Sequence, residues 1–210
     1  MSIHLPPSHV RPSHRAAALT LVLIAMGSMV DNVAAQRRVA PDSLRHIQDV
    51  SPLHGPAGTE VTVFTENLPI QAKVHVGVGA TRTGFEALFE AEQGMWGEIS
   101  ATITIPETAP WDRAVVLIAF DAIFAPIGIS DAFHVTNGDG MLRRTGEITG
   151  EGVECRAMRD TDGFLYTLIG EVGDLEEGDA VQVEGTYVET SMCMQGTTIS
   201  VLRVMPPPPQ

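Results

Sequence analysis

Two cysteines, Cys155 and Cys193, are the residues whose type and spacing limit the possible chemistry most clearly. The chain contains no C-x-x-C sequence, so the motif of a thioredoxin-like redox centre is absent. A structural zinc site takes four Cys or His ligands, but no histidine follows His134. The pair therefore forms a disulfide or remains as two reactive thiols, and the cellular compartment decides between these alternatives.

The N-terminal segment has the order of regions found in secretory signal peptides. Arg11 and Arg15 precede an uncharged apolar run, Ala16–Val30, and small residues follow it. We predict cleavage between Ala35 and Gln36. An uncleaved membrane anchor is the alternative, although the run has only 15 residues, fewer than the roughly 20 that span a bilayer. The predicted location is periplasmic or extracellular, without stable membrane insertion after cleavage.

Export favours the disulfide over free thiols, because periplasmic and extracellular compartments are oxidising. Both cysteines fall in a C-terminal segment of about 65 residues, which buries a marginal core and gains from a covalent link. The chain-entropy model assigns roughly 3–4 kcal/mol to a crosslink that closes a loop of this length. We therefore predict a structural disulfide between Cys155 and Cys193.

A second candidate for chemistry is the sequence DTDG at Asp160–Gly163, which resembles the beginning of a calcium-binding loop. Counted from Asp160, the twelfth position of such a loop would be Glu171. The intervening FLYTLIG is typical of a strand, however, and Asp162-Gly163 is a strong hairpin signal. We predict a hairpin turn here, with calcium binding as the alternative.

The remaining polar residues do not form a recognisable catalytic set. The acidic sequences FEALFEAE and DLEEGD could supply a carboxylate pair for acid–base chemistry, but we expect both to be solvated surfaces. His75 and His134 fall in predicted strands and could meet across a sheet. No G-x-S-x-G sequence marks a serine nucleophile. We therefore assign no catalytic, cofactor-binding or metal-binding residue and expect no cofactor.

Hydrophobic alternation predicts an all-β chain with two domains. In the first domain, short strands are predicted at 59–64, 72–79, 97–106, 114–120 and 131–136. The segment 84–95 is the best helix candidate, although a strand and loop fit it equally well. Trp96 and Trp111 are expected to cover the core of this domain.

After the short NGDG sequence, five further strands are predicted within about 65 residues, enough to close a small barrel without exposed sheet edges. These strands are RRTGEIT, GVECRAM, FLYTLIG, AVQVEGTYVE and TTISVLRV. The predicted organisation is a signal peptide at 1–35, a flexible leader at 36–46, a first domain at 47–136, a linker and domain entry at 137–145, a barrel at 146–204 and a proline-rich tail at 205–210.

Two sequence resemblances refine these architectures. The stretch DVSPLHGPAGTEVTVFTENLP, together with ATITIPETAPWDRAVVLIAF and SDAFHVT, resembles the IPT/TIG family of immunoglobulin-like domains over about residues 47–136. The resemblance implies an immunoglobulin-like sandwich that serves as a spacer or binding module. The chain departs from the family at FTENLP, where a Gly-x-x-Phe turn is usual.

The second half resembles an OB-fold-type domain of unknown function in exported bacterial proteins. The resemblance rests on GVEC, DGFLYTL, GDAVQVEGTYVE and SMCMQGTTISV, within about residues 146–204. It implies a small five-stranded barrel but no particular ligand, because one fold supports many functions. The predicted fold class is therefore all-β, an immunoglobulin-like sandwich followed by an OB-like barrel.

The charge of the chain limits its partners. The full sequence has a net charge of −13, and without residues 1–35, which hold two arginines and one aspartate, 11 basic and 25 acidic side chains remain. Nucleic-acid affinity depends on Lys and Arg, so we expect no nucleic-acid partner. We predict an exported, non-catalytic binding or interaction protein whose partner is a protein or small ligand of the cell envelope. A small exported enzyme, or an accessory domain with a carboxylate pair on the barrel, is the alternative.

Overall fold

The computed structural model describes residues 44–66, 68–80 and 84–209, and within these residues it contains strands and no helix. The described part of the chain therefore has no helix that is long and apolar enough to cross a membrane. The all-β prediction is confirmed. The predicted signal peptide, with its Ala35–Gln36 cleavage site, lies outside the described residues.

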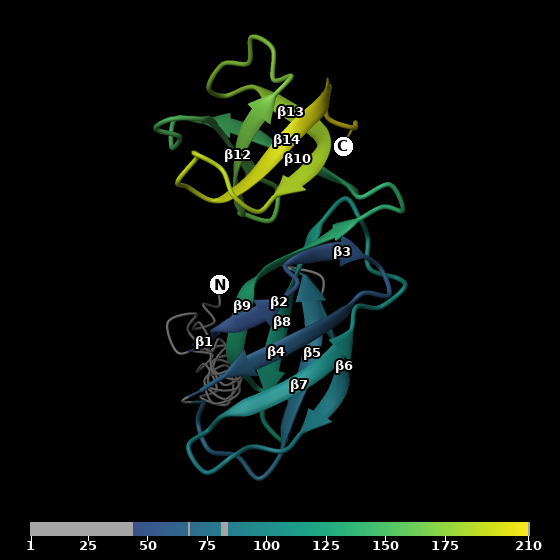
Figure 1. The fold of residues 1–210 in the computed structure, drawn as a ribbon, viewed down its shortest axis with the longest axis vertical. Coiled ribbons are helices and arrows are strands. Elements are labelled where there is room, and N and C mark those ends of the chain that lie inside the picture. The colour runs from purple at the N-terminus through teal and green to yellow at the C-terminus, as the bar shows by residue number, and fades with distance from the viewer. Residues whose placement is uncertain (1–43, 67, 81–83, 210) are drawn as a thin grey trace, which may run out of the picture. The chain divides into compact units, whose positions relative to one another are not determined.

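The first half of the described chain consists of two sheets, which we call the two-sheet region (Figure 1). The larger sheet has the order β1 (Arg45–Ile47), β9 (Pro126–Thr136), β8 (Ala114–Phe120), β5 (Val74–Ala80) and β6 (Gly84–Ala91), and β3 (His54–Pro56) also pairs with β9. The smaller sheet has the order β2 (Asp49–Ser51), β4 (Glu60–Thr65) and β7 (Ile99–Thr104).

The two sheets enclose one apolar core, to which the alternating residues of each strand contribute. In β7, for example, Ile99, Ala101 and Ile103 are buried whereas the residues between them are exposed. The strands predicted from alternation are all present. The segment 84–95 contains strand β6 rather than a helix. Its sequence alternates, with Phe85, Ala87, Phe89 and Ala91 on one face, but Ala, Leu and Glu also favour a helix, so the sequence fitted both structures.

The second half forms a closed five-stranded barrel, as predicted, and it is coloured green to yellow in Figure 1. Its strands are β10 (Met141–Thr149), β11 (Arg156–Asp160), β12 (Leu165–Gly170), β13 (Ala180–Val188) and β14 (Thr197–Met205). They follow the order β10-β11-β12-β14-β13, and β13 pairs with β10 to close the barrel. The pairing of β12 with β14 is parallel, and the other pairings are antiparallel.

The barrel has its own core, separate from that of the two sheets. Leu142 and Ile148 of β10 belong to this core, and Arg144 on the same strand is also fully buried. Strand β10 therefore begins at Met141, five positions before the predicted start of the barrel at 146. Similarly, β1 begins at Arg45, within the predicted leader.

The turn between β11 and β12 is the hairpin that the sequence predicted. One carboxylate oxygen of Asp160 accepts hydrogen bonds from the backbone N–H groups of Asp162 and Phe164, at 3.0 and 2.8 Å. Gly163 has a φ of 95°, a left-handed conformation that glycine adopts without a steric cost. The residues between Asp160 and Glu171 are mostly in strand β12, as expected, and do not form a twelve-residue loop.

Candidate functional site

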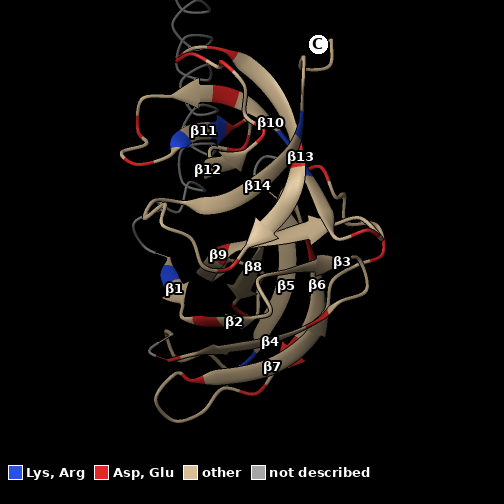
Figure 2. Ribbon diagram, turned by 45° about the horizontal axis from the view of Figure 1, so that its top comes forward, with Lys and Arg blue, Asp and Glu red and all other residues tan. Residues whose placement is uncertain are grey.

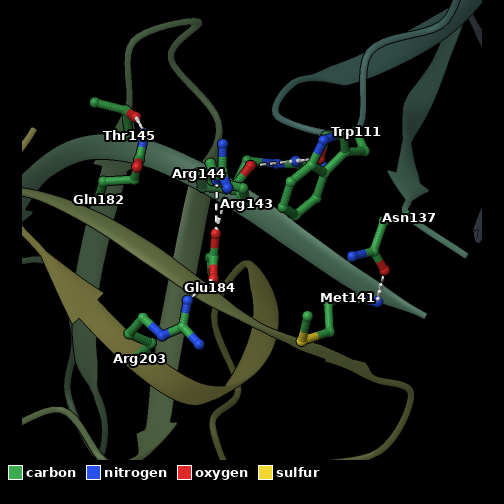
Figure 3. A network of polar contacts seen from close by, with 9 residues as sticks. All are labelled: Trp111, Asn137, Met141, Arg143, Arg144, Thr145, Gln182, Glu184 and Arg203. Atoms are coloured by element: carbon green, nitrogen blue, oxygen red, sulfur yellow. Dashed lines mark hydrogen bonds and ion pairs between the residues drawn. The ribbon is translucent and has the colours of Figure 1, made fainter. Parts of the chain in front are cut away.

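Residues 42–210 form one compact unit, in which a short turn connects the two sheets to the barrel. The side-chain Oδ1 of Asn137 accepts hydrogen bonds from the backbone N–H groups of Asp139 and Met141 (Figure 3). The backbone N–H of Gly140 also donates to the Asn137 carbonyl at 3.0 Å. The NGDG sequence is therefore a closed, hydrogen-bonded turn that brings β10 directly beside the end of β9.

Arg144 is the central residue of the junction between the two sheets and the barrel. It occupies an inward-facing position of β10 and is only 1% exposed. Its Nε donates to the hydroxyl of Tyr166 at 2.9 Å, and one terminal nitrogen donates to the carbonyl oxygens of Trp111 and Arg143 at 3.0 and 2.6 Å. Because Trp111 belongs to the two-sheet region, this barrel side chain ties the two parts of the chain together.

The positive charge of Arg144 has no carboxylate in ion-pair contact among the described residues. Uncharged and distant groups compensate this positive charge instead. Tyr166 is fully buried, and burial raises the pKa of its phenol, so the hydroxyl stays protonated. Asp160 interacts with Tyr166, and burial raises the pKa of the Asp160 carboxyl while its hydrogen bonds to the backbone and the charge of Arg144 oppose that shift. The guanidinium is thus held mainly by neutral acceptors.

His134 of β9 completes the buried cluster and is 2% exposed. Its Nδ1 lies 3.4 Å from a terminal nitrogen of Arg144, and its Nε2 lies 3.0 Å from the hydroxyl oxygen of Thr197. A guanidinium has only donors, so Nδ1 must be the acceptor and Nε2 must carry the proton. Burial, and then the charge of Arg144, lower the pKa of His134 to about 3. The imidazole is therefore neutral and donates to Thr197.

The state of His134 predicts how stability should depend on pH. Its pKa is about 3 in the folded chain and about 6.5 in an unfolded one, so the unfolded chain binds more protons between these values. The free energy of unfolding should be fully developed above pH 6.5 and should decrease as the pH falls towards 3. The maximum slope from one such group is about 1.4 kcal/mol per pH unit.

Urea unfolding from about pH 7 to about pH 5 should reveal this slope. His134→Gln keeps a donor and an acceptor but does not titrate, so its slope should be smaller by that amount. The raised pKa of Asp160 acts in the opposite sense at lower pH, and the chosen range avoids most of its effect. If the free energy of unfolding had the same pH dependence in the wild type and in His134→Gln, the low pKa assigned to His134 would be contradicted.

Two further contacts join the barrel to the loop before β8. Arg113 donates two hydrogen bonds to the carboxylate of Asp162, at 2.9 and 2.6 Å, and that carboxylate is only 6% exposed. The guanidinium of Arg143 lies 4.2 Å from the ring centroid of Trp111 and also contacts Glu184 (Figure 3). Arg113, Arg143 and Arg144 therefore connect the two parts at separate points.

Beside this junction lies a cleft of about 640 Å³ that residues of both parts line, and we call it the junction cleft. Ser130, Asp131 and His134 contribute from β9, and Tyr187, Glu189 and Thr197 contribute from the barrel. This volume is within the range of about 300–1,000 Å³ that is usual for small-molecule sites.

The rim of the junction cleft is acidic. Glu189 and Asp131 have side chains that are 81% and 79% exposed, and the imidazole nitrogens of His54 and His46 lie 3.8 and 3.7 Å from their carboxylate oxygens. No Lys or Arg is among the described residues that line the cleft. Acidic residues also occur on many other turns and strands of both parts (Figure 2), so only their position at this cleft distinguishes these two.

Tyr187 forms one wall of the junction cleft, and its ring is held in place by two histidines. The ring of His54 stacks on it with centroids 4.4 Å apart, and the ring of His134 lies 5.5 Å away. The hydroxyl of Tyr187 forms no hydrogen bond with the described residues. It is therefore available to a bound molecule, and burial raises the pKa of this phenol, so it remains a donor.

The hydroxyl of Thr197 and the imidazole of His134 resemble a nucleophile and its base, but their surroundings are unsuitable for catalysis. A histidine base is usually oriented by a carboxylate that stabilises its protonated form. Here the second ring nitrogen faces the cation Arg144, which disfavours protonation. His134 cannot accept the Thr197 proton under these conditions, so the pair suits binding and not hydroxyl activation.

The structure joins Cys155 and Cys193 through an Sγ–Sγ bond of 1.88 Å. The flanking Met192 and Met194 are exposed. Cys193 lies in the loop between β13 and β14, whose residues form one side of the junction cleft. The disulfide therefore anchors a wall of the candidate site, a role that the sequence did not indicate.

Other predictions about single residues have mixed outcomes. His75 does not meet His134: it lies opposite Phe120 and Glu90, whereas His134 pairs with His54. That hypothesis was wrong because β8 lies between β5 and β9, and His75 lies opposite Phe120 at one end of β8 whereas His134 lies opposite Ala114 at the other.

Trp96 and the acidic sequences can also be placed. Trp96 is 76% exposed, so its expected place over the core was wrong, whereas Trp111 packs partly against the core. In DLEEGD, the Asp179 carboxylate accepts the backbone N–H of Glu176 and stabilises a turn. In FEALFEAE, Glu90 pairs with Lys73. No cluster of three potential metal-binding side chains occurs among the residues that the structure describes.

Sequence reasoning missed the residues that form the junction. Arg144 had a detectable signal, because it occupies the apolar phase of a strand between Leu142 and Ile148. Thr197 and Tyr187 had none, since both appear as ordinary residues of barrel strands. No protein-family model, curated protein or solved structure matches the chain.

Proposed function

We propose that this chain is an exported, non-catalytic binding or interaction protein whose ligand occupies the junction cleft. The observation that carries the proposal is that both parts of the chain line one cleft beside a buried polar network that fixes their contact. The same network removes the basicity of His134. This favours binding over the alternative of a small enzyme.

The carboxylates of the barrel also support binding over acid–base catalysis. Glu184 contacts Arg143 and Arg203, and Asp162 contacts Arg113. The Asp160 carboxylate accepts two backbone N–H groups in its hairpin. These buried acids therefore have structural partners. Acid–base chemistry requires a pair of carboxyl groups, one with a raised and one with a lowered pKa, and these acids do not form such a pair.

We further propose that the two-sheet region is an immunoglobulin-like sandwich of the IPT/TIG type and that the barrel is of the OB type. Two face-to-face sheets around one core support the first assignment. The second is supported by five strands in the order first, second, third, fifth, fourth, with closure onto the first. The disulfide is consistent with a periplasmic or extracellular location.

Filling the junction cleft should abolish ligand binding without unfolding the chain. Ala132 lines the cleft, and Ala132→Trp would occupy part of its volume. Ala87, on the exposed edge strand β6, gives a matched control as Ala87→Trp. Exported protein of each type should be examined by native mass spectrometry for bound small molecules and by crosslinking for a stoichiometric envelope protein.

The expected result is a ligand or partner that is present with the wild type and Ala87→Trp but is lost with Ala132→Trp. If Ala132→Trp does not fold, Thr190→Trp in the exposed β13–β14 loop tests the same cleft. Retention of every bound species by folded cleft variants would refute the proposed site. A hydrolytic activity that disappears when the acids of DLEEGD are replaced would favour the enzyme instead.

A further inference from the structure

The hydroxyl of Thr197 has a fixed hydrogen-bond direction because of the residues buried behind it. Arg144 donates to Nδ1 of His134, so Nε2–H of His134 donates to the Thr197 oxygen at 3.0 Å. The hydroxyl accepts this bond, and its own hydrogen must point elsewhere. Among the described residues its side chain has no other hydrogen-bond partner. Because Thr197 lines the junction cleft, it offers a donor to an oxygen atom of a bound molecule.

Ser130, Ser191 and Thr198 also line the cleft, but their hydroxyl groups are already engaged. Ser130 accepts the backbone N–H of Leu117 and donates to a carbonyl. The hydroxyls of Ser191 and Thr198 lie 2.6 Å apart and bond to each other. These bonds leave the hydroxyls of Thr197 and Tyr187, together with that of the exposed Thr190, as hydroxyl donors for a ligand.

The charges at the rim specify a second property of the ligand. Asp131 lies in β9 and Glu189 lies just after β13, so each part of the chain supplies one carboxylate to the lining. Each has only a histidine as a distant partner, and no basic residue is found among the described residues of the lining. Both side chains are largely exposed, so their attraction for a cation is screened by water and depends on the salt concentration. An ammonium group on the ligand would match this rim.

We propose that the junction cleft binds an amino sugar, as a monomer or short oligomer, with a ring or hydroxyl oxygen at Thr197 and Tyr187 and the ammonium near Asp131 and Glu189. The proposal rests on the proposed binding function of the cleft and names its ligand class. An amino sugar combines a cation with several oxygen acceptors in a molecule that suits a cleft of about 640 Å³. A polyamine has the cations without the acceptors, and a neutral sugar has the acceptors without the cation.

Two matched oligosaccharides test this class directly. The glucosamine tetramer has free amines, and its fully N-acetylated counterpart has the same rings without charge. Titration calorimetry at about pH 6, where amines are protonated, should show binding of the glucosamine tetramer at least about tenfold tighter than that of the acetylated one. Glu189→Gln should reduce this preference, and added salt should weaken binding of the charged tetramer alone.

Variants of Thr197 test the donor. Thr197→Val keeps the side-chain shape and should weaken binding of the glucosamine tetramer about tenfold, the effect of one lost hydrogen bond. Thr197→Ser retains the hydroxyl and should bind like the wild type. Thr102→Val is the matched control. Thr102 is exposed on β7, in the smaller sheet of the two-sheet region, so this change should not affect binding.

The outcomes separate this proposal from the function on which it rests. Equal affinity for both tetramers, or for spermidine, would overturn the amino-sugar assignment, and unchanged affinity in Thr197→Val would overturn the role of the donor. If neither tetramer binds but another species depends on the open cleft in the Ala132→Trp experiment, the ligand class is wrong and the binding function stands. If nothing depends on the open cleft, both proposals fail.

Discussion

Arg144→Ala should lower the free energy of unfolding by about 3–5 kcal/mol, through the combined loss of packing and of buried hydrogen bonds. The side chain is 1% exposed, so its removal leaves a cavity that surrounding groups can fill only in part. The hydroxyl of Tyr166 and Nδ1 of His134 would lose a donor, and the Trp111 carbonyl would keep only the backbone N–H of Arg143 at 3.3 Å. Each unsatisfied buried group adds to the cost.

The variant should also change the cooperativity of unfolding, because Arg144 contacts both parts of the chain. The wild type should unfold in one transition, with fluorescence of Trp111 and circular dichroism coinciding. In Arg144→Ala the barrel and the two sheets should unfold at different urea concentrations. Arg144→Lys should recover little of the loss, since an ammonium lacks the planar arrangement of donors that reaches four groups.

Arg159→Ala provides the control for removal of an arginine from the barrel. Arg159 is 42% exposed and pairs with Glu151 at the surface, so its replacement should change stability far less than that of Arg144. If Arg144→Ala were as mild as this control and unfolded in a single transition, the buried network would not be what holds the junction together.

The architecture was predictable because it depends on local patterns. Alternation in strands such as Ile99–Thr104 separates a buried face from an exposed one, and Asp162-Gly163 specifies a tight hairpin. These features act over a few residues, so the sequence alone displays them. Edge strand β6 was ambiguous because both of its faces are largely exposed and little burial pattern remains.

The junction was not predictable because its contacts join residues that are far apart in the sequence. Arg144, His134 and Thr197 lie on three different strands, and their contacts arise only when the barrel closes and β9 lies against it. A buried arginine contradicts the usual preference of this residue for the surface. Its place between Leu142 and Ile148 was a local signal, but the partners that make burial tolerable come from three other strands and a loop.

Removal of the disulfide should be the second large perturbation. Replacing both Cys155 and Cys193 with alanine should lower the free energy of unfolding by roughly 3–4 kcal/mol, the loop-closure value for a crosslink of this span. The loop closed by the bond has a sequence separation of 38 and includes β12 and β13, so the unfolded chain would gain most of its freedom within the barrel.

The double variant should affect the junction cleft as well as the barrel, because the loop that carries Cys193 is one of its walls. Cys193 is 7% exposed, and its backbone N–H is bonded to the Ser191 hydroxyl at 3.2 Å, so the loop keeps some local order without the crosslink. We therefore expect weakened ligand binding together with lower stability, whereas a surface change in the same loop, Met194→Ser, should alter neither.

Alkylation and mass spectrometry distinguish the structural bond from a reactive thiol pair. Exported wild type, unfolded without reductant, should gain no alkyl groups, and after reduction it should gain two, at Cys155 and Cys193. Urea unfolding should then give similar free energies of unfolding for the reduced and the double-alanine proteins, and a higher value for the oxidised protein. If all three were equally stable, the bond would contribute nothing to the barrel, and a reactive role for these cysteines would have to be reconsidered.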